Sequence, residues 1–258
     1  MSMISVEYRD TVAIVKLCKS VTNALDLELV NELGAVLEKV KHESSVRGLV
    51  LGSSSDKFFS IGFDIQRMFD FPRKGFEAFF KAFNHVCLSL YTIPKPTVAA
   101  ITGHAVAGGC ILVLCCDYRF IAEDRKLMGL NEIKLGVPVP YLADCVLRDI
   151  VETRVAKEIM DTGAFYAPMD SSRMGLVDAV FPSGEVLERA VEKAKLVGSW
   201  PQGAFAIIKR NRTEEVEMRL LAQREKKEQS FIDCWYSDEA RRLLREAIKK
   251  FSFDSSKG

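Results

Sequence analysis

Hydrophobic positions follow two different spacings along the first half of the chain. Short, mostly apolar runs that are typical of buried strands stand at Val12–Leu17, Gly48–Leu51 and Thr97–Ile101. Between these runs, apolar residues recur at helical spacing in Leu25–His42 and Phe76–Leu90. The pattern therefore predicts strands that alternate with helices, stacked as β-α units with right-handed crossovers.

The second half of the chain is expected to be mostly helical. Shorter strands are predicted before it at Ile4–Tyr8, Tyr118–Ala122 and Leu127–Gly129, and an apolar helix from Gly108 through Leu114. After Val151 the strand signals fade, and the helical spacing predicts helices at Ala156–Asp161, Asp170–Met174, Glu185–Ser199, Thr213–Phe231 and Asp238–Lys250. Because Trp200-Pro201 interrupts this pattern, we expect an α/β core over residues 1–198 and a helical C-terminal region over residues 199–258.

Composition mainly excludes classes of partner. Of the 258 residues, 48% are hydrophobic and 28% are charged, which fits a sizeable core beneath an ordinary polar surface. The formal net charge is +1 and the charged tail mixes both signs, so we expect no nucleic-acid and no membrane partner. The seven cysteines form no C-x-x-C pair and are expected to be reduced, and the three scattered histidines predict no metal site.

The ends of the chain bear on its location in the cell. The first ten residues already carry charge, which is not typical of a secretory signal. The apolar stretch Val98–Cys116 contains His104 and three glycines, and predicts a buried strand and helix rather than a membrane span. The C-terminal Ser-Lys-Gly lacks the leucine of the peroxisomal Ser-Lys-Leu signal. We therefore expect an intracellular, soluble protein, cytoplasmic in the first place, with mitochondrion and peroxisome left open.

Three segments combine glycines with polar residues near expected strand ends. They read Lys57-Phe-Phe-Ser-Ile-Gly-Phe-Asp64, then Ile93-Pro-Lys-Pro-Thr-Val-Ala-Ala-Ile-Thr-Gly-His-Ala-Val-Ala-Gly-Gly-Cys110 followed by Cys116-Asp117, and lastly Met128-Gly-Leu-Asn-Glu-Ile-Lys-Leu-Gly-Val-Pro138. The first is similar to the crotonase pattern F-S-x-G-x-D, and the second to the K-P-x-I-A-A-I-x-G-x-A-x-G-G-G stretch that ends in C-D. Since the similarity runs in order over roughly residues 10–185, the chain resembles the crotonase (enoyl-CoA hydratase/isomerase) superfamily, and within it the Δ3,Δ2-enoyl-CoA isomerases most.

This resemblance implies an architecture and a substrate class. The fold would be α/β, a crotonase-like spiral of β-β-α units with a helical C-terminal trimerisation region. The substrate would be an acyl-CoA thioester, and the assembly a homotrimer or a hexamer. No cofactor is implied, because CoA is part of the substrate.

The glycines also have a direct physical meaning. A residue without Cβ lets the backbone approach a ligand closely and leaves N–H groups unpaired. Two such N–H groups that converge on one point form an oxyanion hole for a thioester enolate. The resemblance assigns these donors to Phe63 and Gly108, and the dipole of the helix predicted to begin at Gly108 favours negative charge there. The alternative is that the glycines only permit tight packing.

The remaining expected site residues surround these donors. By the resemblance, the substrate-binding residues are Ala24, Ser60, Ile61, Gly62, Asp64 and Gly109. Asp64 has a second interpretation as the cap of the following helix, which we favour over a catalytic role. Lys19, Arg67 and Lys95 are unranked candidates for contacts with the CoA phosphates.

One position separates the possible reactions. Hydratases of the superfamily use two glutamates, and at the first of these positions this chain has Ile111, which cannot activate a water molecule. At the second it has Glu132, and a single carboxylate suffices to move a proton from C2 to C4 of a 3-enoyl thioester. Apolar neighbours would raise the pKa of Glu132 toward the working pH, whereas an ordinary surface carboxylate is the alternative. His104 is expected to be a hydrogen-bonded, buried histidine rather than a base.

Several alternatives remain at this stage. Asp144, Asp149 or Glu152 could supply a second carboxylate. Another reaction on the same scaffold, such as hydration, decarboxylation, thioester hydrolysis or dehalogenation, would then replace isomerisation. A non-catalytic CoA- or RNA-binding member of the superfamily is the alternative from a different class, and the retention of Glu132 and both glycine motifs counts against it.

Overall fold

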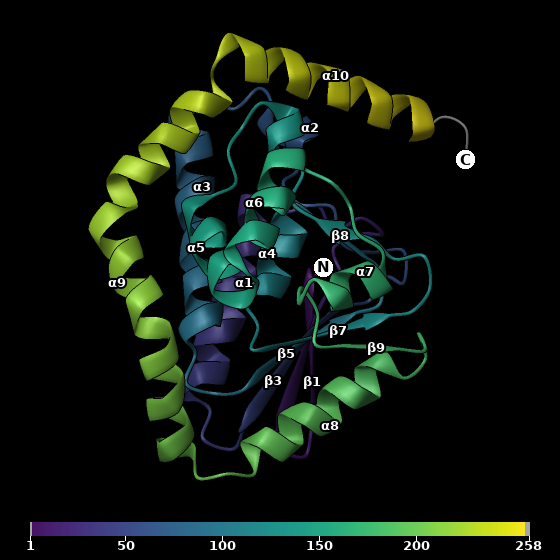
Figure 1. The fold of residues 1–258 in the computed structure, drawn as a ribbon, viewed down its shortest axis with the longest axis vertical. Helices are drawn as coiled ribbons and strands as arrows, with labels where there is room; N and C mark the ends of the chain where they lie inside the picture. The colour runs from purple at the N-terminus through teal and green to yellow at the C-terminus, as the bar shows by residue number, and fades with distance from the viewer. Residues whose placement is uncertain (1, 256–258) are drawn as a thin grey trace.

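The computed structural model describes residues 2–255, with side chains through residue 250, as a six-stranded sheet, a three-stranded sheet and surrounding helices (Figure 1). The larger sheet contains β1 (Ile4–Arg9), β2 (Val12–Leu17), β3 (Gly48–Ser53), β5 (Thr97–Ile101), β7 (Tyr118–Ala122) and β9 (Ala179–Phe181), in this order. The smaller sheet contains β4 (Phe58–Ser60), β6 (His104–Val106) and β8 (Met128–Gly129). Apart from the antiparallel pair β1–β2, neighbouring strands in both sheets are parallel.

Helices connect and cover the strands. They are α1 (Leu27–His42), α2 (Ile65–Met68), α3 (Arg73–Thr92), α4 (Gly108–Leu114), the 3₁₀ helix η1 (Glu132–Leu135), α5 (Tyr141–Ile150), α6 (Thr153–Thr162), α7 (Pro168–Arg173), α8 (Val186–Gly198), α9 (Gln202–Trp235) and α10 (Asp238–Ser255). Figure 1 shows α9 along one side of the molecule, with α8 near its beginning and α10 near its end.

Strands come in consecutive pairs, and each pair divides between the two sheets. β3 and β4, β5 and β6, and β7 and β8 each place their first strand in the larger sheet and their second in the smaller one, and a helix follows each pair. Simple strand–helix alternation is therefore wrong, and the spiral of β-β-α units implied by the resemblance is confirmed. Of the second strands, β8 agrees with the strand predicted at Leu127–Gly129. The strands β4 and β6 escaped the hydrophobic pattern because each is only three residues long.

Both faces of the larger sheet are buried. Val12 and Ile14 of β2 pack with Val186 and Ala190 of α8 on one face. Alternate residues such as Val15 point into the main core on the other face, which is shared with α1 and α3. Double-sided burial explains why these strands read as continuous apolar runs rather than alternating ones.

The second half of the chain departs from the prediction in three places. It contains the short strand β9, where no strand was expected. The α5 helix was not expected, although it buries Leu142, Cys145 and Val146 at helical spacing. The α9 helix begins at Gln202, well before the expected Thr213, because Pro201 precedes the first helical residue instead of ending the structure. Proline is tolerated there since the first helical turn needs no N–H donor from it.

The C-terminal Ser-Lys-Gly lies outside the described residues.

A buried ion pair fastens α9 to the larger sheet. The Asp117 carboxylate, before β7, accepts hydrogen bonds from the Thr97 backbone N–H at 2.8 Å and the Thr97 hydroxyl at 3.0 Å. It also pairs with the Lys209 ammonium at 2.8 Å and with Arg212. Since Lys209 and Asp117 are both buried, the aspartate of the Cys-Asp motif has a structural role.

Replacing Lys209 by methionine should lower the free energy of unfolding by about 2–3 kcal/mol, because the Asp117 carboxylate stays buried with one cation fewer. Urea denaturation at neutral pH measures this loss. Arg210→Met changes an exposed neighbour on the same helix and should alter stability by only a few tenths of a kcal/mol. Equal losses in the two variants would show that the ion pair does not hold α9.

Candidate active site

A cavity of about 930 Å³ opens beside the smaller sheet. Its wall is formed by the segment after β2 (Lys19–Ala24), the segment around β4 (residues 57–66), the β6–α4 turn (Val106–Gly108) and η1 with its flanks (residues 131–140). Phe165, two aromatic residues of α9 and two residues of α10 complete it. Widely separated parts of the sequence thus share one cavity.

The two expected oxyanion donors meet at this wall. The N–H of Leu25 donates to the Gly62 carbonyl at 2.8 Å and the N–H of Asp64 donates to the Leu25 carbonyl at 2.9 Å, so the N–H of Phe63 between them points away from Leu25. Gly108 is the first residue of α4, and its N–H therefore has no helical acceptor. Within residues 2–255, neither N–H donates a hydrogen bond to the protein.

Close backbone packing brings these donors together. A Cβ on Gly62 would lie 2.8 Å from the Gly108 nitrogen, and Gly62 has a φ of +87° that favours glycine. Ala107, just before Gly108, has a φ of +47°, an unfavourable conformation for a residue with a side chain. Strain of this kind is frequent where a backbone is shaped for a ligand. The glycines therefore do permit tight packing, which was the alternative to an oxyanion hole, but they also lie beside two unpaired N–H donors.

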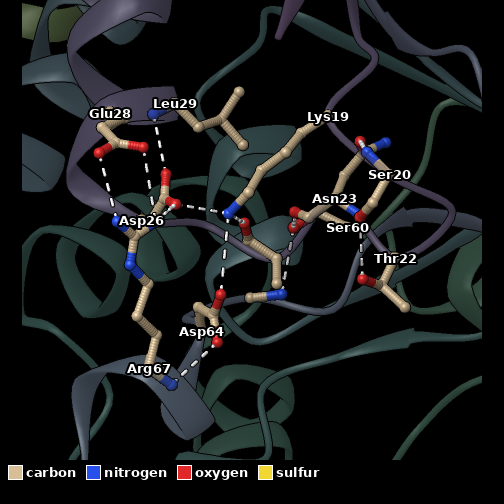
Figure 2. A network of polar contacts seen from close by, with 12 residues as sticks. Lys19, Ser20, Thr22, Asn23, Asp26, Glu28, Leu29, Ser60, Asp64 and Arg67 are labelled. Atoms are coloured by element: carbon tan, nitrogen blue, oxygen red, sulfur yellow. Dashed lines mark hydrogen bonds and ion pairs between the residues drawn. The ribbon is translucent and has the colours of Figure 1, made fainter. Parts of the chain in front are cut away.

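A buried hydrogen-bond cluster joins the Asn23-Ala-Leu segment to β4 (Figure 2). The Ser60 hydroxyl donates to the Asn23 carbonyl at 2.8 Å and accepts from the Gly62 N–H at 3.1 Å. The Asn23 amide donates in turn to the Ser53 hydroxyl at 2.9 Å. Ser60 and Gly62 consequently support the wall from behind. Gly109 does so as well, because it packs directly against the Ser60 carbonyl. Ala24, Ile61 and Asp64 line the cavity itself.

An ionic network at the same edge holds Lys19 (Figure 2). The Lys19 ammonium lies 2.6 Å from Asp26 and 3.7 Å from Asp64, and donates to the Ala24 carbonyl at 2.9 Å. Arg67 approaches Asp26 at 2.6 Å. Burial opposes ionisation of Asp26, but the hydrogen bonds from Lys19 and from the Leu29 N–H outweigh it and lower the pKa of this carboxyl.

The helix-cap interpretation of Asp64 is confirmed. Its carboxylate accepts from the Arg67 N–H at 3.1 Å at the start of α2. Of the basic candidates, only Lys19 lines the cavity. Arg67 is engaged by Asp26, and Lys95 is buried elsewhere, where its ammonium donates to the Val40 and Glu43 carbonyls.

Glu132 is the buried acid of the site. It opens η1, directly after β8, and its side chain lines the cavity with only 5% of its surface exposed. Its Oε2 atom is buried and has no hydrogen-bond partner in the described chain. Burial raises the pKa of Glu132 to about 7, in spite of a hydrogen bond from its own backbone that acts to lower it. Glu132 is therefore neither exposed nor ion-paired within residues 2–255.

The other candidate acids lie elsewhere. Asp144 pairs with Arg148 at 2.6 Å, Asp149 accepts from the Tyr91 hydroxyl at 3.1 Å, and Glu152 is exposed at the start of α6. Among the described residues, Asp64 and Glu132 are the carboxylates that line the cavity, and Asp64 already caps α2. Ile111 is buried in α4.

His104 is a half-buried, structural residue. Its Nδ1 atom accepts from the Leu127 N–H at 2.9 Å, so the expectation that it is not a free base agrees with its contacts. Burial, together with the nearby Lys126 and Lys57, lowers its pKa. All seven cysteines are free thiols, as expected. No group of metal-ligating side chains forms a site among the described residues.

The enoyl-CoA hydratase/isomerase family model matches residues 7–253. The chain belongs to this family. Human mitochondrial enoyl-CoA delta isomerase 1 is 30% identical over 240 residues, which cover 93% of this chain and 80% of the human protein. The peroxisomal enoyl-CoA delta isomerase 1 of Arabidopsis thaliana is 32% identical over 193 residues, or 74% of this chain and 80% of the plant protein.

Solved structures of the enoyl-CoA hydratase/isomerase family confirm the fold. The crystal structure of human mitochondrial Δ3-Δ2-enoyl-CoA isomerase superposes with a TM-score of 0.95 at 28% identity, and covers 98% of this chain and 99% of the other. An enoyl-CoA hydratase from Bacillus halodurans has a TM-score of 0.88 at 24% identity, covers 95% of this chain and 100% of the other, and shows the shared fold alone. The crotonase-like architecture and the isomerase-like enzyme class are thus confirmed. In the described residues of this family member, no helix has the length and apolarity to cross a bilayer.

Several residues of the site were missed by sequence reasoning. Asn131, Phe231, Trp235 and Lys250 all line the cavity. Asn131 directly precedes Glu132 in the segment Met128–Pro138 and could have been proposed from that position. The other three lie on α9 and α10, where the sequence contains no family motif that would have pointed to them.

Burial of Glu132 without a partner should cost stability at alkaline pH. The folded state binds its proton up to about pH 7, whereas an unfolded glutamate loses it near pH 4.3, so the free energy of unfolding falls as pH rises through this window. Glu132→Gln should therefore be stabilised, relative to the parent, by about 2–3 kcal/mol more at pH 8 than at pH 4.5. Urea denaturation at both pH values measures this difference, and the exposed-site variant Glu158→Gln should show none. A pH-independent effect of Glu132→Gln would mean that Glu132 is normally ionised in the folded protein.

Proposed function

We propose that this protein is an isomerase that converts 3-enoyl-CoA thioesters into 2-enoyl-CoA thioesters, as in the β-oxidation of unsaturated fatty acids. The observation that carries the proposal is the buried carboxylate of Glu132, whose Oε2 atom has no hydrogen-bond partner in the described chain, in the same cavity as the unpaired N–H groups of Phe63 and Gly108. The isomerase names of the relatives support it.

The proposed reaction is a 1,3-proton transfer. The Glu132 carboxylate removes a proton from C2, and the electron pair of that C–H bond forms the C2–C1 double bond as the thioester oxygen becomes negative. The N–H groups of Phe63 and Gly108 donate to this oxygen. The protonated Glu132 then delivers the proton to C4, the double bond moves from C3–C4 to C2–C3, and the carboxylate is regenerated.

The pKa of about 7 suits both halves of this cycle. A carboxylate with an ordinary pKa would be too weak a base to remove a C2 proton effectively near neutral pH. Because the same group must return the proton, a much higher pKa would slow the second step. The apolar setting of Glu132 thus supports a shuttle rather than a one-way base.

Rival reactions find less support in the cavity. Hydration needs a second group to activate water, and Ile111 stands in that position within α4. Among the described lining residues there is no histidine, no cysteine and no acid besides Asp64 and Glu132. A purely CoA- or RNA-binding role would leave the unpaired Glu132 without a purpose, although its burial has a free-energy cost.

Substrate contacts follow from charge. Lys57 and Lys250 line the cavity and form no ion pair within the described residues, so we assign the CoA phosphates to them. Lys19 is already neutralised by Asp26 and Asp64 and is expected to hold the Ala24 segment instead. The proposed reaction uses no cofactor, since CoA belongs to the substrate.

A homotrimer or hexamer remains part of the proposal. The exposed Ile207 and Ile208 near the start of α9, at 60% and 63% exposure, are suited to a subunit contact.

Glu132→Gln should lower kcat for trans-3-hexenoyl-CoA by about 10²–10⁴-fold, because the proton carrier is lost while the shape of the site is kept. The absorbance of the conjugated 2-enoyl thioester follows the reaction. Asp149→Asn removes an acid that lies outside the cavity and should leave kcat within about twofold of the parent. Accumulation of a 3-hydroxyacyl-CoA by the parent would favour hydration, and an inactive parent that still binds acyl-CoA would favour a binding role.

The pH dependence should reflect the same carboxylate. Since Glu132 must be ionised to accept the C2 proton, kcat/KM should rise with pH and level off above a midpoint near pH 7. Initial rates from pH 5 to 9 with constant ionic strength test this. A midpoint near that of an ordinary glutamate would contradict the assigned role of burial.

A further inference from the structure

The residues that line the cavity differ in chemistry from one segment to another. The segments after β2 and around β4 contribute polar residues, namely Lys19, Ser20, Lys57, Asp64 and Gln66. The segment after Glu132 and the α9 helix contribute apolar residues, namely Leu135, Val137, Pro140, Phe231 and Trp235. Glu132 lines the same cavity, as do Phe63 and Gly108 with their unpaired N–H groups. A thioester with a charged head and a hydrocarbon tail matches this division.

Two aromatic residues of α9 form a rigid part of the apolar lining. The ring of Trp235 stacks on Phe76 of α3 with centroids 4.2 Å apart, and Phe231 stacks on Phe80 at 4.1 Å. Phe231 is 3% exposed and Trp235 is 1% exposed. Phe76 and Phe80 are also buried, so a second aromatic layer lies behind the first.

The end of α9 is fixed to the segment that follows Glu132. The Cys234 thiol donates to the Gly136 carbonyl at 3.1 Å, one residue beyond η1. The Tyr236 hydroxyl donates to the Phe71 carbonyl at 2.8 Å, just before α3. These contacts tie the end of α9, which carries Phe231 and Trp235, to the segment after η1 and to the segment before α3.

We infer that Phe231 and Trp235 close the acyl-chain end of the cavity and set the longest chain that the enzyme accepts. This inference rests on the proposed acyl-CoA substrate. Each methylene buried before the chain reaches the wall should improve kcat/KM by about fourfold. Chains that extend beyond it must displace packed rings, so kcat/KM should fall.

A chain-length series tests the wall directly. The parent and Phe231→Ala are assayed with even-numbered thioesters from trans-3-hexenoyl-CoA to trans-3-hexadecenoyl-CoA. The length with the highest kcat/KM should move up by about two to four carbons in the variant, because the lost ring leaves room for the tail. Phe231→Leu, a milder change, should move it less and guards against misfolding of the alanine variant. Phe120→Ala removes a buried ring on the other face of the larger sheet and should lower stability without moving the maximum.

A second measurement does not depend on turnover. The chain has two tryptophans, and Trp200 is 61% exposed, so Trp200→Phe leaves Trp235 as the single reporter. Saturated acyl-CoAs from acetyl to palmitoyl are titrated, with excitation where adenine does not absorb. Trp235 emission should stay unchanged with acetyl-CoA and shift once the chain is long enough to touch the wall.

The outcomes separate the two proposals. If no 3-enoyl-CoA is isomerised but Trp235 emission responds to chain length, the isomerase assignment fails and the acyl wall stands. If isomerisation occurs but the preferred length is the same in the parent, Phe231→Leu and Phe231→Ala, the wall assignment is overturned. An equal emission change with acetyl-CoA and palmitoyl-CoA would overturn it as well.

Discussion

The close approach of backbone to backbone around the three-stranded sheet is the constraint on which the active site depends. A Cβ on Gly103 would come within 2.6 Å of the Phe58 backbone, and a Cβ on Gly109 would collide with the Ser60 carbonyl. With glycine at these positions, the β4 and β6 segments lie in direct contact, and the N–H groups of Phe63 and Gly108 face one cavity. A side chain at either position would force these segments apart and would therefore move the two N–H groups. The positions of the donors thus depend on glycine at both places.

Burial of charge is handled in opposite ways at two places in the molecule. Asp117 is buried beside Lys209, Arg212 and two donors of Thr97, so its negative charge is compensated. Glu132 is buried with one oxygen unpaired, and its proton is correspondingly hard to remove. The first arrangement stabilises the attachment of α9, and the second keeps a carboxyl group poised between its two protonation states.

Much of the fold and part of the site could be predicted from local sequence. The long strands and helices have strong periodicity, and the glycine motifs with Glu132 follow one another in the order typical of the family. The cap role of Asp64 could be predicted, because an aspartate just before a helix can accept a hydrogen bond from a free N–H of the first turn. The short strands β4 and β6 and the 3₁₀ helix escaped, since three or four residues carry too little pattern. Phe231 and Trp235 escaped for a different reason: their spacing on α9 is that of any buried helix face, and only tertiary packing directs them to the cavity.

The span of the cavity lining, from Lys19 to Lys250, has a consequence for the synthesis of the protein. The strands and glycine turns emerge from the ribosome before the aromatic residues of α9 and the α10 helix. A nascent chain can thus build its sheets before the wall of the cavity is complete. Because these contacts join distant parts of the sequence, they also add to the loop-closure entropy that slows folding. The cavity is accordingly complete only once α9 and α10 have packed beside segments that were made much earlier.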